Sequence, residues 1–215
     1  MNDAEQRVVK KGDSIELEIE SLAFGGKGVA KVDGLAIFVE RTIPGQKVLA
    51  RIVKKKKSFA EAYPLEYLKK APNEIEAKCA AFGTCGGCRL QNLEYDDQLQ
   101  EKTRQVRDLV QRVGGFADFD VPTALPSPSA FHYRNKMEFT FTPSPWRNHP
   151  DDEDEPLGLG QHIPGRFDKI VHIETCYLQK PIMNEIMNFV FAFAQEHGWE
   201  GYNNRTHAGW ARNLV

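Results

Sequence analysis

The sequence predicts a mixed β and α+β fold, in which a small OB-like β-barrel is followed by an antiparallel sheet with helices. Three observations support this prediction. Short stretches of alternating apolar and polar residues, separated by turn signals, fill the first 70 residues. One long alternating stretch and two stretches with helical periodicity follow them. The 215 residues are sufficient for one large or two small domains, each with a real core.

The barrel is expected over residues 10–70. Its first strand covers residues 15–20, where three apolar residues alternate with glutamates before the turn at Gly25-Gly26. Asp33-Gly34 is a hairpin signal and Pro44-Gly45 is a turn signal. Three further strands, at residues 29–32, 35–39 and 48–53, are separated by these two signals, and a fifth strand is expected at residues 59–68. Five such short strands have too little area for an open two-sided sheet, so closure into a barrel is expected.

The second domain is expected over residues 72–215. A helix is predicted from Tyr95 to the stop signal at Gly114-Gly115. Residues 131–141 alternate strictly and predict a strand, which pairs with strands at residues 157–162 and 169–173 in an antiparallel sheet. Residues 182–197 predict a second helix, whose buried face consists of Ile182, Ile186, Phe189, Val190 and Phe193. The apolar stretch 210–215 stops before a sheet is complete, so we expect this domain to be incomplete at its C-terminus.

The net charge of −2 conceals an uneven distribution. Residues 1–70 carry 14 basic and 10 acidic residues, whereas the rest of the chain carries 14 basic and 20 acidic residues. Between Glu40 and Glu61 there is no acidic residue, and the basic residues there are Arg41, Lys47, Arg51, Lys54, Lys55, Lys56 and Lys57. This local positive patch predicts a polyanionic partner. The acidic stretch 151–155 is expected in a solvent-exposed loop.

Several classes of protein are excluded by composition. No stretch approaches the roughly 18 uncharged apolar residues of a membrane span, and the first 20 residues are charged where a signal peptide would be apolar. We therefore expect a cytoplasmic monomer without a membrane partner. Four cysteines are too few for a disulfide scaffold of this length.

The cysteines follow a three-plus-one arrangement. Cys79, Cys85 and Cys88 lie within ten residues, and Cys176 lies far along the chain. Structural zinc sites more often use two close pairs, whereas many four-iron clusters take several thiolates from one compact loop. Gly86 and Gly87 would let backbone N–H groups approach the sulfur atoms. This spacing favours a [4Fe-4S] cluster, with zinc or unliganded core thiols as the alternatives. If all four cysteines are ligands, none is available as a nucleophile.

Three motifs resemble one known family. They are Cys79-Ala-Ala-Phe-Gly-Thr-Cys85-Gly-Gly-Cys88-x-x-Gln91, Tyr133-Arg134-Asn135-Lys136-Met137-Glu138-Phe139, and Gly158-Leu-Gly-Gln-His-x-Pro-Gly165 ahead of Cys176. Together they closely resemble the RNA (uracil-5-)-methyltransferases, especially members that act on ribosomal RNA. The resemblance covers residues 13–215. It implies that the barrel is a TRAM domain and that the second domain binds a [4Fe-4S] cluster through Cys79, Cys85, Cys88 and Cys176.

The resemblance also implies an activity. Family members form 5-methyluridine in RNA, here 23S ribosomal RNA, with S-adenosylmethionine as the methyl donor. Their Rossmann-like catalytic domain would follow Val215, so we expect it to be absent and this chain to be inactive alone. No residue here is then expected to be catalytic or to bind S-adenosylmethionine. The alternatives are a stand-alone, non-catalytic RNA-binding iron–sulfur protein and a transfer RNA (uracil-5-)-methyltransferase.

Two groups of basic residues are the candidate RNA contacts. The first is Lys47, Arg51, Lys54, Lys55, Lys56 and Lys57 on the barrel, because clustered cations release counter-ions from phosphates. The second is Arg134 and Lys136, which share the polar face of the strand predicted at 131–141 with His132. For both groups the alternative is an ordinary solvated surface.

Overall fold

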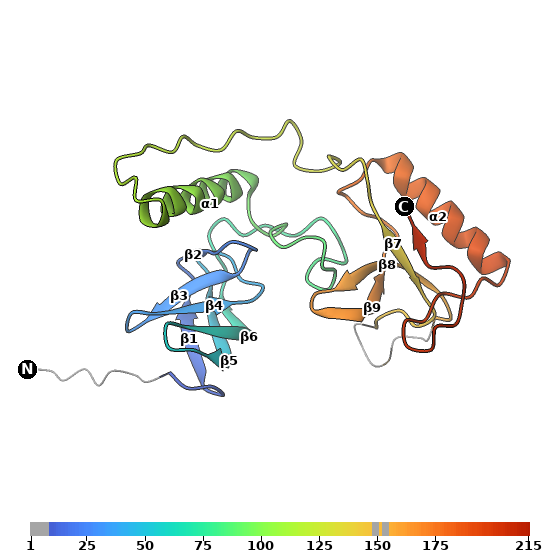
Figure 1. Ribbon diagram of the computed structural model, residues 1–215, viewed down its shortest axis with the longest axis horizontal. Coiled ribbons are helices and arrows are strands. Elements are labelled where there is room, and N and C mark those ends of the chain that lie inside the picture. The colour runs from blue at the N-terminus through green and yellow to red at the C-terminus, as the bar shows by residue number, and fades with distance from the viewer. Residues whose placement is uncertain (1–8, 148–150, 152–154) are drawn as a thin grey trace, which may run out of the picture. The chain divides into compact units, whose positions relative to one another are not determined.

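The computed structural model describes residues 9–147, 151 and 155–215 (Figure 1). Acidic residues 152–154, which we expected in a solvent loop, lie outside the described residues. The chain divides into two compact units, and each is built from two segments. Unit 1 consists of Met1–Glu76 and Asn92–Pro126, and unit 2 consists of Ala77–Gln91 and Ser127–Val215. The single boundary that we predicted near residue 71 therefore differs from this division, because residues 92–126 group with the barrel.

A barrel forms the body of unit 1. Its sheet has the strand order β1-β5-β6-β4-β3-β2, with the bounds β1 (Ser14–Glu18), β2 (Ser21–Leu22), β3 (Gly28–Val32), β4 (Leu35–Val39), β5 (Lys47–Lys55) and β6 (Phe59–Lys69). Only Ile19 and Glu20 separate β1 from β2, so the two ends of the strand order are one bent segment. The N–H of Ile19 donates to Gln46 O, and that of Glu20 donates to Val29 O. This segment thus closes the sheet on itself.

The interior of the barrel follows from the alternation in its strands. Ile15 and Leu17 of β1 are buried, while the glutamates between and beside them face outward. The remaining buried residues of this core include Ala30, Ile37, Val39, Val48, Ala50, Ile52, Ala60 and Ala62. Small residues on β6 leave room for the larger side chains opposite, as a narrow barrel requires. β4 pairs with β6 in parallel, whereas β3 pairs with β4, and β5 with β6, in antiparallel orientation.

Helix α1 (Tyr95–Asp108) completes unit 1. It continues as a π-helical turn, η1 (Leu109–Val113), and ends at Gly114, where the sequence predicted a stop. Glu101 accepts a hydrogen bond from the N–H of Leu22 at 2.8 Å, and the Gln105 amide donates to the carbonyl of Leu22 at 3.0 Å. These contacts hold the helix on β2, although the sequence analysis had placed it in the second domain.

Unit 2 contains a four-stranded antiparallel sheet. The strand order is β10-β7-β8-β9, with the bounds β7 (Phe139–Thr142), β8 (Gly158–Ile163), β9 (Arg166–His172) and β10 (Asn213–Leu214). The strand that we predicted at residues 131–141 is wrong in its first half, because β7 begins at Phe139. His132 has a left-handed backbone with φ of 58°, which an extended strand does not allow, and Arg134 forms only an isolated bridge with Gln179.

Helix α2 (Pro181–Glu196) packs on this sheet with a different face from the one that we predicted. Met187 and Ala194 are buried against the sheet. Four of the five residues of the predicted stripe are exposed: Ile182 is 55%, Ile186 53%, Phe189 71% and Phe193 40% accessible. The fifth, Val190, is half-buried and packs against the core as expected. Because α2 is apolar on two faces, its periodicity identified a stripe without identifying which stripe meets the sheet.

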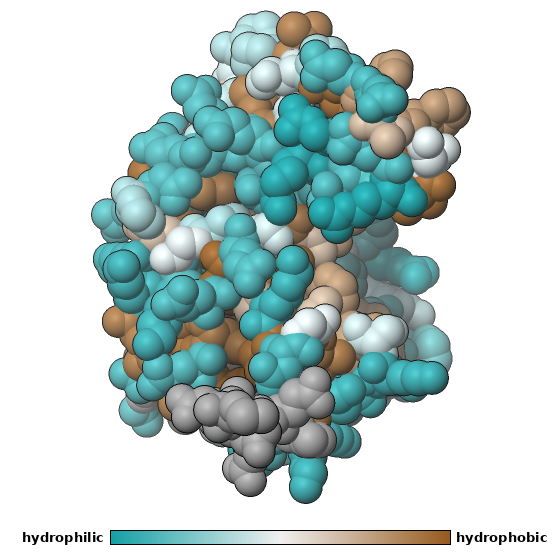
Figure 2. Space-filling model, turned by 90° about the vertical axis from the view of Figure 1, so that its left-hand side faces the viewer, coloured by the Kyte–Doolittle hydropathy of each residue, from teal (hydrophilic) through white to brown (hydrophobic). Residues whose placement is uncertain are grey.

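The described surface is mixed in polarity. Hydrophilic side chains cover most of the face in Figure 2, and hydrophobic side chains gather in separate patches between them. Within the described residues, neither α1 nor α2 has the length and apolar content that crossing a bilayer requires.

Candidate functional site

The four cysteines come together in unit 2. Cys79, Cys85 and Cys88 lie in the loop before Gln91, and Cys176 follows β9. All four line one cavity of about 30 Å³, which we call the cysteine cavity. Its other lining residues are Phe82, Gly87, Gln91, Arg134, Met137, Gln161, Ile173, Thr175, Tyr177 and Leu178. The sequence spacing that suggested a common site therefore corresponds to residues that share a cavity, and no two of the cysteines form a disulfide.

Backbone hydrogen bonds shape the cysteine loop. The N–H of Cys85 donates to Ala81 O at 2.8 Å, which forms a tight turn, and the N–H of Gly86 donates to His162 O at 2.9 Å, which fixes this turn to β8. A Cβ atom at Gly86 would lie 2.8 Å from that same carbonyl oxygen, so the close approach requires glycine. The side chain of Gln91 accepts a hydrogen bond from the N–H of Cys79 at 3.2 Å and closes the loop.

Cys176 is held by α2. Asn184 accepts a hydrogen bond from the N–H of Cys176 at 2.9 Å and donates to its carbonyl oxygen at 3.2 Å. The Gln179 amide also donates to Asn184, at 2.7 Å. The sequence analysis missed Asn184, because a single polar residue in the first turn of an amphipathic helix carries no signal for a partner eight residues earlier.

Burial controls the protonation of the thiols. Burial raises the pKa of Cys85 to about 11, and the N–H of Gly87, 3.3 Å from its sulfur atom, only partly opposes this rise. The pKa of Cys88 is also raised by burial, against the hydrogen bond from Gln91 and the charge of Arg134. In the metal-free protein both thiols are therefore protonated at neutral pH, and a metal that binds them must displace protons.

This protonation predicts slow alkylation of Cys85 in the reduced, metal-free protein. Because the thiolate is the reactive species, the rate with iodoacetamide should rise with pH until about pH 11. In urea, where burial is lost, the profile should level off near the ordinary value of about 8.5. Mass spectrometry of the Cys85 peptide after timed quenching measures both profiles. Identical profiles in folded and unfolded protein would contradict the burial of this thiol.

The donor set is suited to a soft metal. Four thiols, an N–H group directed at one sulfur and apolar neighbours such as Phe82 and Ile173 line the cavity. In the described part of the chain, no three His, Cys, Asp or Glu side chains are grouped closely enough to hold a single metal ion. A zinc ion with Zn–S bonds of about 2.3 Å would need such a grouping. The cavity is also small, so the loop must move outward to admit a larger group.

The basic patch that we predicted on the barrel is divided by the structure. A hydrogen bond from the N–H of Lys56 to Phe59 O closes the turn between β5 and β6, and the four residues Lys54–Lys57 form its tip, which we call the basic tip. Lys47 begins the same strand. At about 3.4 Å per residue, Lys47 lies roughly 24 Å from Lys54. Lys47 and the basic tip are thus at opposite ends of β5, with the exposed Arg51 between them.

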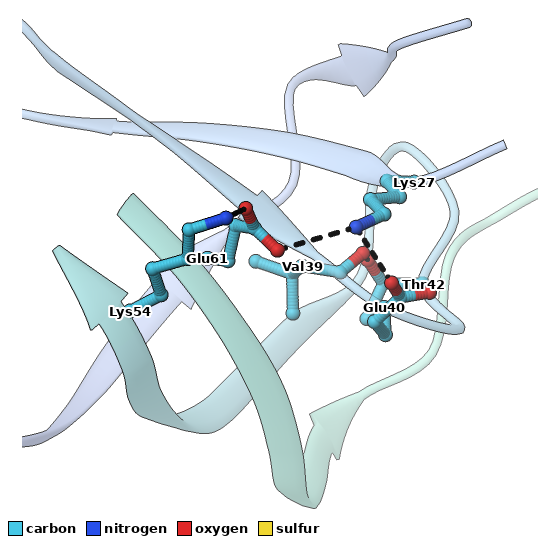
Figure 3. Close-up of polar contacts among 6 residues, drawn as sticks. All are labelled: Lys27, Val39, Glu40, Thr42, Lys54 and Glu61. Atoms are coloured by element: carbon cyan, nitrogen blue, oxygen red, sulfur yellow. Dashed lines mark hydrogen bonds and ion pairs between the residues drawn. The ribbon is translucent and has the colours of Figure 1, made fainter. Parts of the chain in front are cut away.

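The lysines also differ in whether a carboxylate offsets their charge, and Figure 3 shows the ion pairs of Lys54 and Lys27. Lys54 bonds Glu61 at 2.8 Å, Glu61 lies 3.6 Å from Lys27, and Lys27 bonds Glu40 at 2.7 Å. The hydrogen bond from Lys54 lowers the pKa of Glu61, and the hydrogen bond to Glu40 raises the pKa of Lys27. Because these groups are solvated, the pairs contribute little to stability. They nevertheless offset the charge of Lys54.

The other lysines of the patch differ in their pairing. Lys47 bonds Glu16 at 2.7 Å. Lys55 donates to the carbonyl of Lys56. Lys56 and Lys57 are exposed, and among the described residues neither has a carboxylate partner. Among these lysines, the positive charge that no carboxylate offsets therefore lies on Lys55, Lys56 and Lys57 in the basic tip.

Arg134 and Lys136 do not lie on one face of a sheet, as we expected. Both precede β7. Arg134 lines the cysteine cavity, where its backbone N–H donates to Leu178 O at 2.9 Å and its guanidinium lies 3.8 Å from the sulfur of Met137. Lys136 is exposed and does not line the cavity. A bend at Asn135, between the two residues, takes the place of the strand that would have aligned them.

Comparisons with known proteins find one domain model and relatives named RNA methyltransferases. Residues 8–65 match the TRAM domain. A protein of Chlorobaculum tepidum named as an uncharacterized RNA methyltransferase is 37% identical over 214 residues, which cover 96% of this chain and 44% of that protein. One of Bacteroides thetaiotaomicron with the same name is 38% identical over 199 residues, 90% of this chain and 44% of its own length. The chain thus spans somewhat under half the length of these relatives.

A solved structure has a similar fold. It is the Pyrococcus abyssi tRNA (uracil-54, C5)-methyltransferase in complex with S-adenosyl-L-homocysteine, with a TM-score of 0.62 and 24% identity. The match covers 92% of this chain and 41% of that one.

These matches correct the fold class that we predicted. We had expected this chain to lack the Rossmann-like methyltransferase domain. Instead, nearly the whole chain aligns with proteins named RNA methyltransferases and superposes on a methyltransferase fold. The expectation that the chain is inactive alone depended on that absence and is withdrawn with it.

Proposed function

We propose that this chain serves an S-adenosylmethionine-dependent RNA (uracil-5-)-methyltransferase that forms 5-methyluridine in 23S ribosomal RNA. The alignment with proteins named RNA methyltransferases over 96% of the chain carries the methyltransferase part of this proposal. The motif resemblance around Cys79, Tyr133 and Gly158 supports uracil C5 and ribosomal RNA as the target. The chain would contribute an RNA-binding barrel and a cluster-binding unit. The methyl group would come from S-adenosylmethionine, and we assign its transfer to no residue of this chain.

The proposed ligands of a [4Fe-4S] cluster are Cys79, Cys85, Cys88 and Cys176. Their convergence on one cavity, the N–H of Gly87 near Cys85 and the apolar surroundings support this assignment. When bound, such a cluster would tie the cysteine loop to the segment after β9 and could accept an electron.

The proposed RNA contact is the basic tip. Phosphate binding needs cations whose charge is not already offset by a neighbouring carboxylate, and Lys56 and Lys57 satisfy this condition better than Lys47 or Lys54. The match of residues 8–65 to the TRAM domain supports RNA as the polyanion. Arg51, exposed on the same strand, extends the contact toward the middle of the barrel.

Deleting the encoding gene in its host tests the proposal. Nucleoside mass spectrometry should then find less 5-methyluridine in 23S ribosomal RNA and an unchanged amount in transfer RNA. The gene should restore the modification, and a copy encoding Cys85→Ser should not. A loss from transfer RNA alone would overturn the ribosomal substrate, and unchanged modification in both RNAs would overturn the methyltransferase function.

A further inference from the structure

Arg134 is the charged residue among those that line the cysteine cavity. The other lining side chains are thiols, amides, a hydroxyl, a phenol and apolar groups. Thiolates that bind a cluster carry negative charge. In that state, the guanidinium of Arg134 is the positively charged group beside the four sulfur atoms.

The backbone and the side chain of Arg134 are both held in place. Its N–H donates to Leu178 O, two residues beyond Cys176, so the segment that carries Arg134 is attached to the segment that carries the fourth cysteine. The guanidinium contacts the Met137 sulfur at 3.8 Å. Within the described residues it forms no ion pair with a carboxylate, so no neighbouring negative charge offsets it.

We propose that Arg134 raises the reduction potential of the cluster bound in the cysteine cavity. This inference rests on the proposed function, which supplies the cluster. One-electron reduction adds negative charge to a group that is already anionic, so a fixed cation at the cavity wall stabilises the reduced form more than the oxidised form. Net charge near a cluster is one of the factors that set its potential.

The size of the effect follows from the position of the side chain. Arg134 is exposed, so water screens its charge and an effective dielectric constant of at least 20, the value near a protein surface, is appropriate. At such screening, loss of one charge near the cavity should lower the equilibrium constant for reduction about tenfold, which corresponds to about 59 mV for one electron.

The test compares four anaerobically purified proteins: the wild type, Arg134→Gln, Arg134→Lys and Lys136→Gln. Lys136→Gln is the matched control, because it removes one charge from the same segment outside the cavity. Iron and sulfide are measured first, and the midpoint potential is then measured by protein-film voltammetry. Arg134→Gln should shift the potential about 60 mV to more negative values, whereas Arg134→Lys and Lys136→Gln should stay near the wild type.

The other possible outcomes would overturn the inference, either alone or together with the proposed cluster. Arg134→Gln with full iron and the same potential as Lys136→Gln would overturn the inference alone. Loss of iron from Arg134→Gln would assign Arg134 to retention of the cluster and would also overturn it. A wild type without iron would overturn both the inference and the proposed cluster. Failure of the inference alone is therefore distinguishable from failure of the cluster assignment.

Discussion

Cys176→Ser should yield a colourless protein with less than one iron atom per chain, where the anaerobically purified wild type should be brown and hold about four. The reason is that Cys176 lies on a different segment from the other three cysteines, so its loss disconnects the cysteine loop from the segment after β9. Ligand exchange also couples metal binding to folding, so the midpoint of urea denaturation should fall.

A neighbouring residue provides the control for this experiment. Thr175→Ser changes the adjacent residue in the same cavity and removes no thiol, so it should retain its iron and colour. Metal-free wild type and metal-free Cys176→Ser should have similar denaturation midpoints, which would attribute the lost stability to the cluster. One zinc atom and no iron in the wild type, or four iron atoms in Cys176→Ser, would refute the assignment.

The double variant Lys56→Gln/Lys57→Gln should bind RNA far more weakly. If each lysine contacts one phosphate, the slope of log affinity against log salt should flatten by about 0.7–0.9 for each, and affinity at 0.1 M salt should fall about 25- to 60-fold. Fluorescence anisotropy with a labelled ribosomal RNA fragment, at several salt concentrations, measures both quantities.

The structure provides a charge-matched control for this double variant. Lys31→Gln/Lys47→Gln removes the same two charges from exposed positions on the barrel, but each lysine there is paired, with Glu20 and Glu16 respectively. This control should keep nearly the wild-type salt slope. Equal flattening in both double variants would mean that overall charge, rather than the basic tip, determines binding.

The sequence predicted the elements whose signals are local. Hairpin turns such as Asp33-Gly34 join strands that are adjacent in the chain, and β4 was predicted at residues 35–39 as observed. The helix from Tyr95 was predicted for the same reason, since periodicity and a glycine stop are both local. What α1 packs against was not predictable, because the contact with Leu22 joins residues about 80 positions apart.

Two other expectations failed for physical reasons. Alternation at residues 131–141 resembled a strand, but the backbone is left-handed at His132 and bends again at Asn135, and side-chain polarity encodes neither feature. The lysines near residue 55 were predicted as one patch, yet carboxylates from β1 and β6 pair with Lys47 and Lys54. The convergence of the cysteines was suggested by their spacing, whereas the place of Arg134 beside them required the fold.

The two-segment construction of each unit has a consequence for synthesis on the ribosome. Cys79, Cys85 and Cys88 belong to unit 2, but residues 92–126, which complete unit 1, are translated before Cys176. At about 5–20 residues per second, the fourth cysteine is made roughly 4–18 s after Cys88. During that interval the barrel can acquire all of its segments, while three thiols remain without the strand, helix and fourth sulfur that enclose them. Nascent chains are therefore most open to oxidation in this interval, and their protection depends on the reductants around the ribosome.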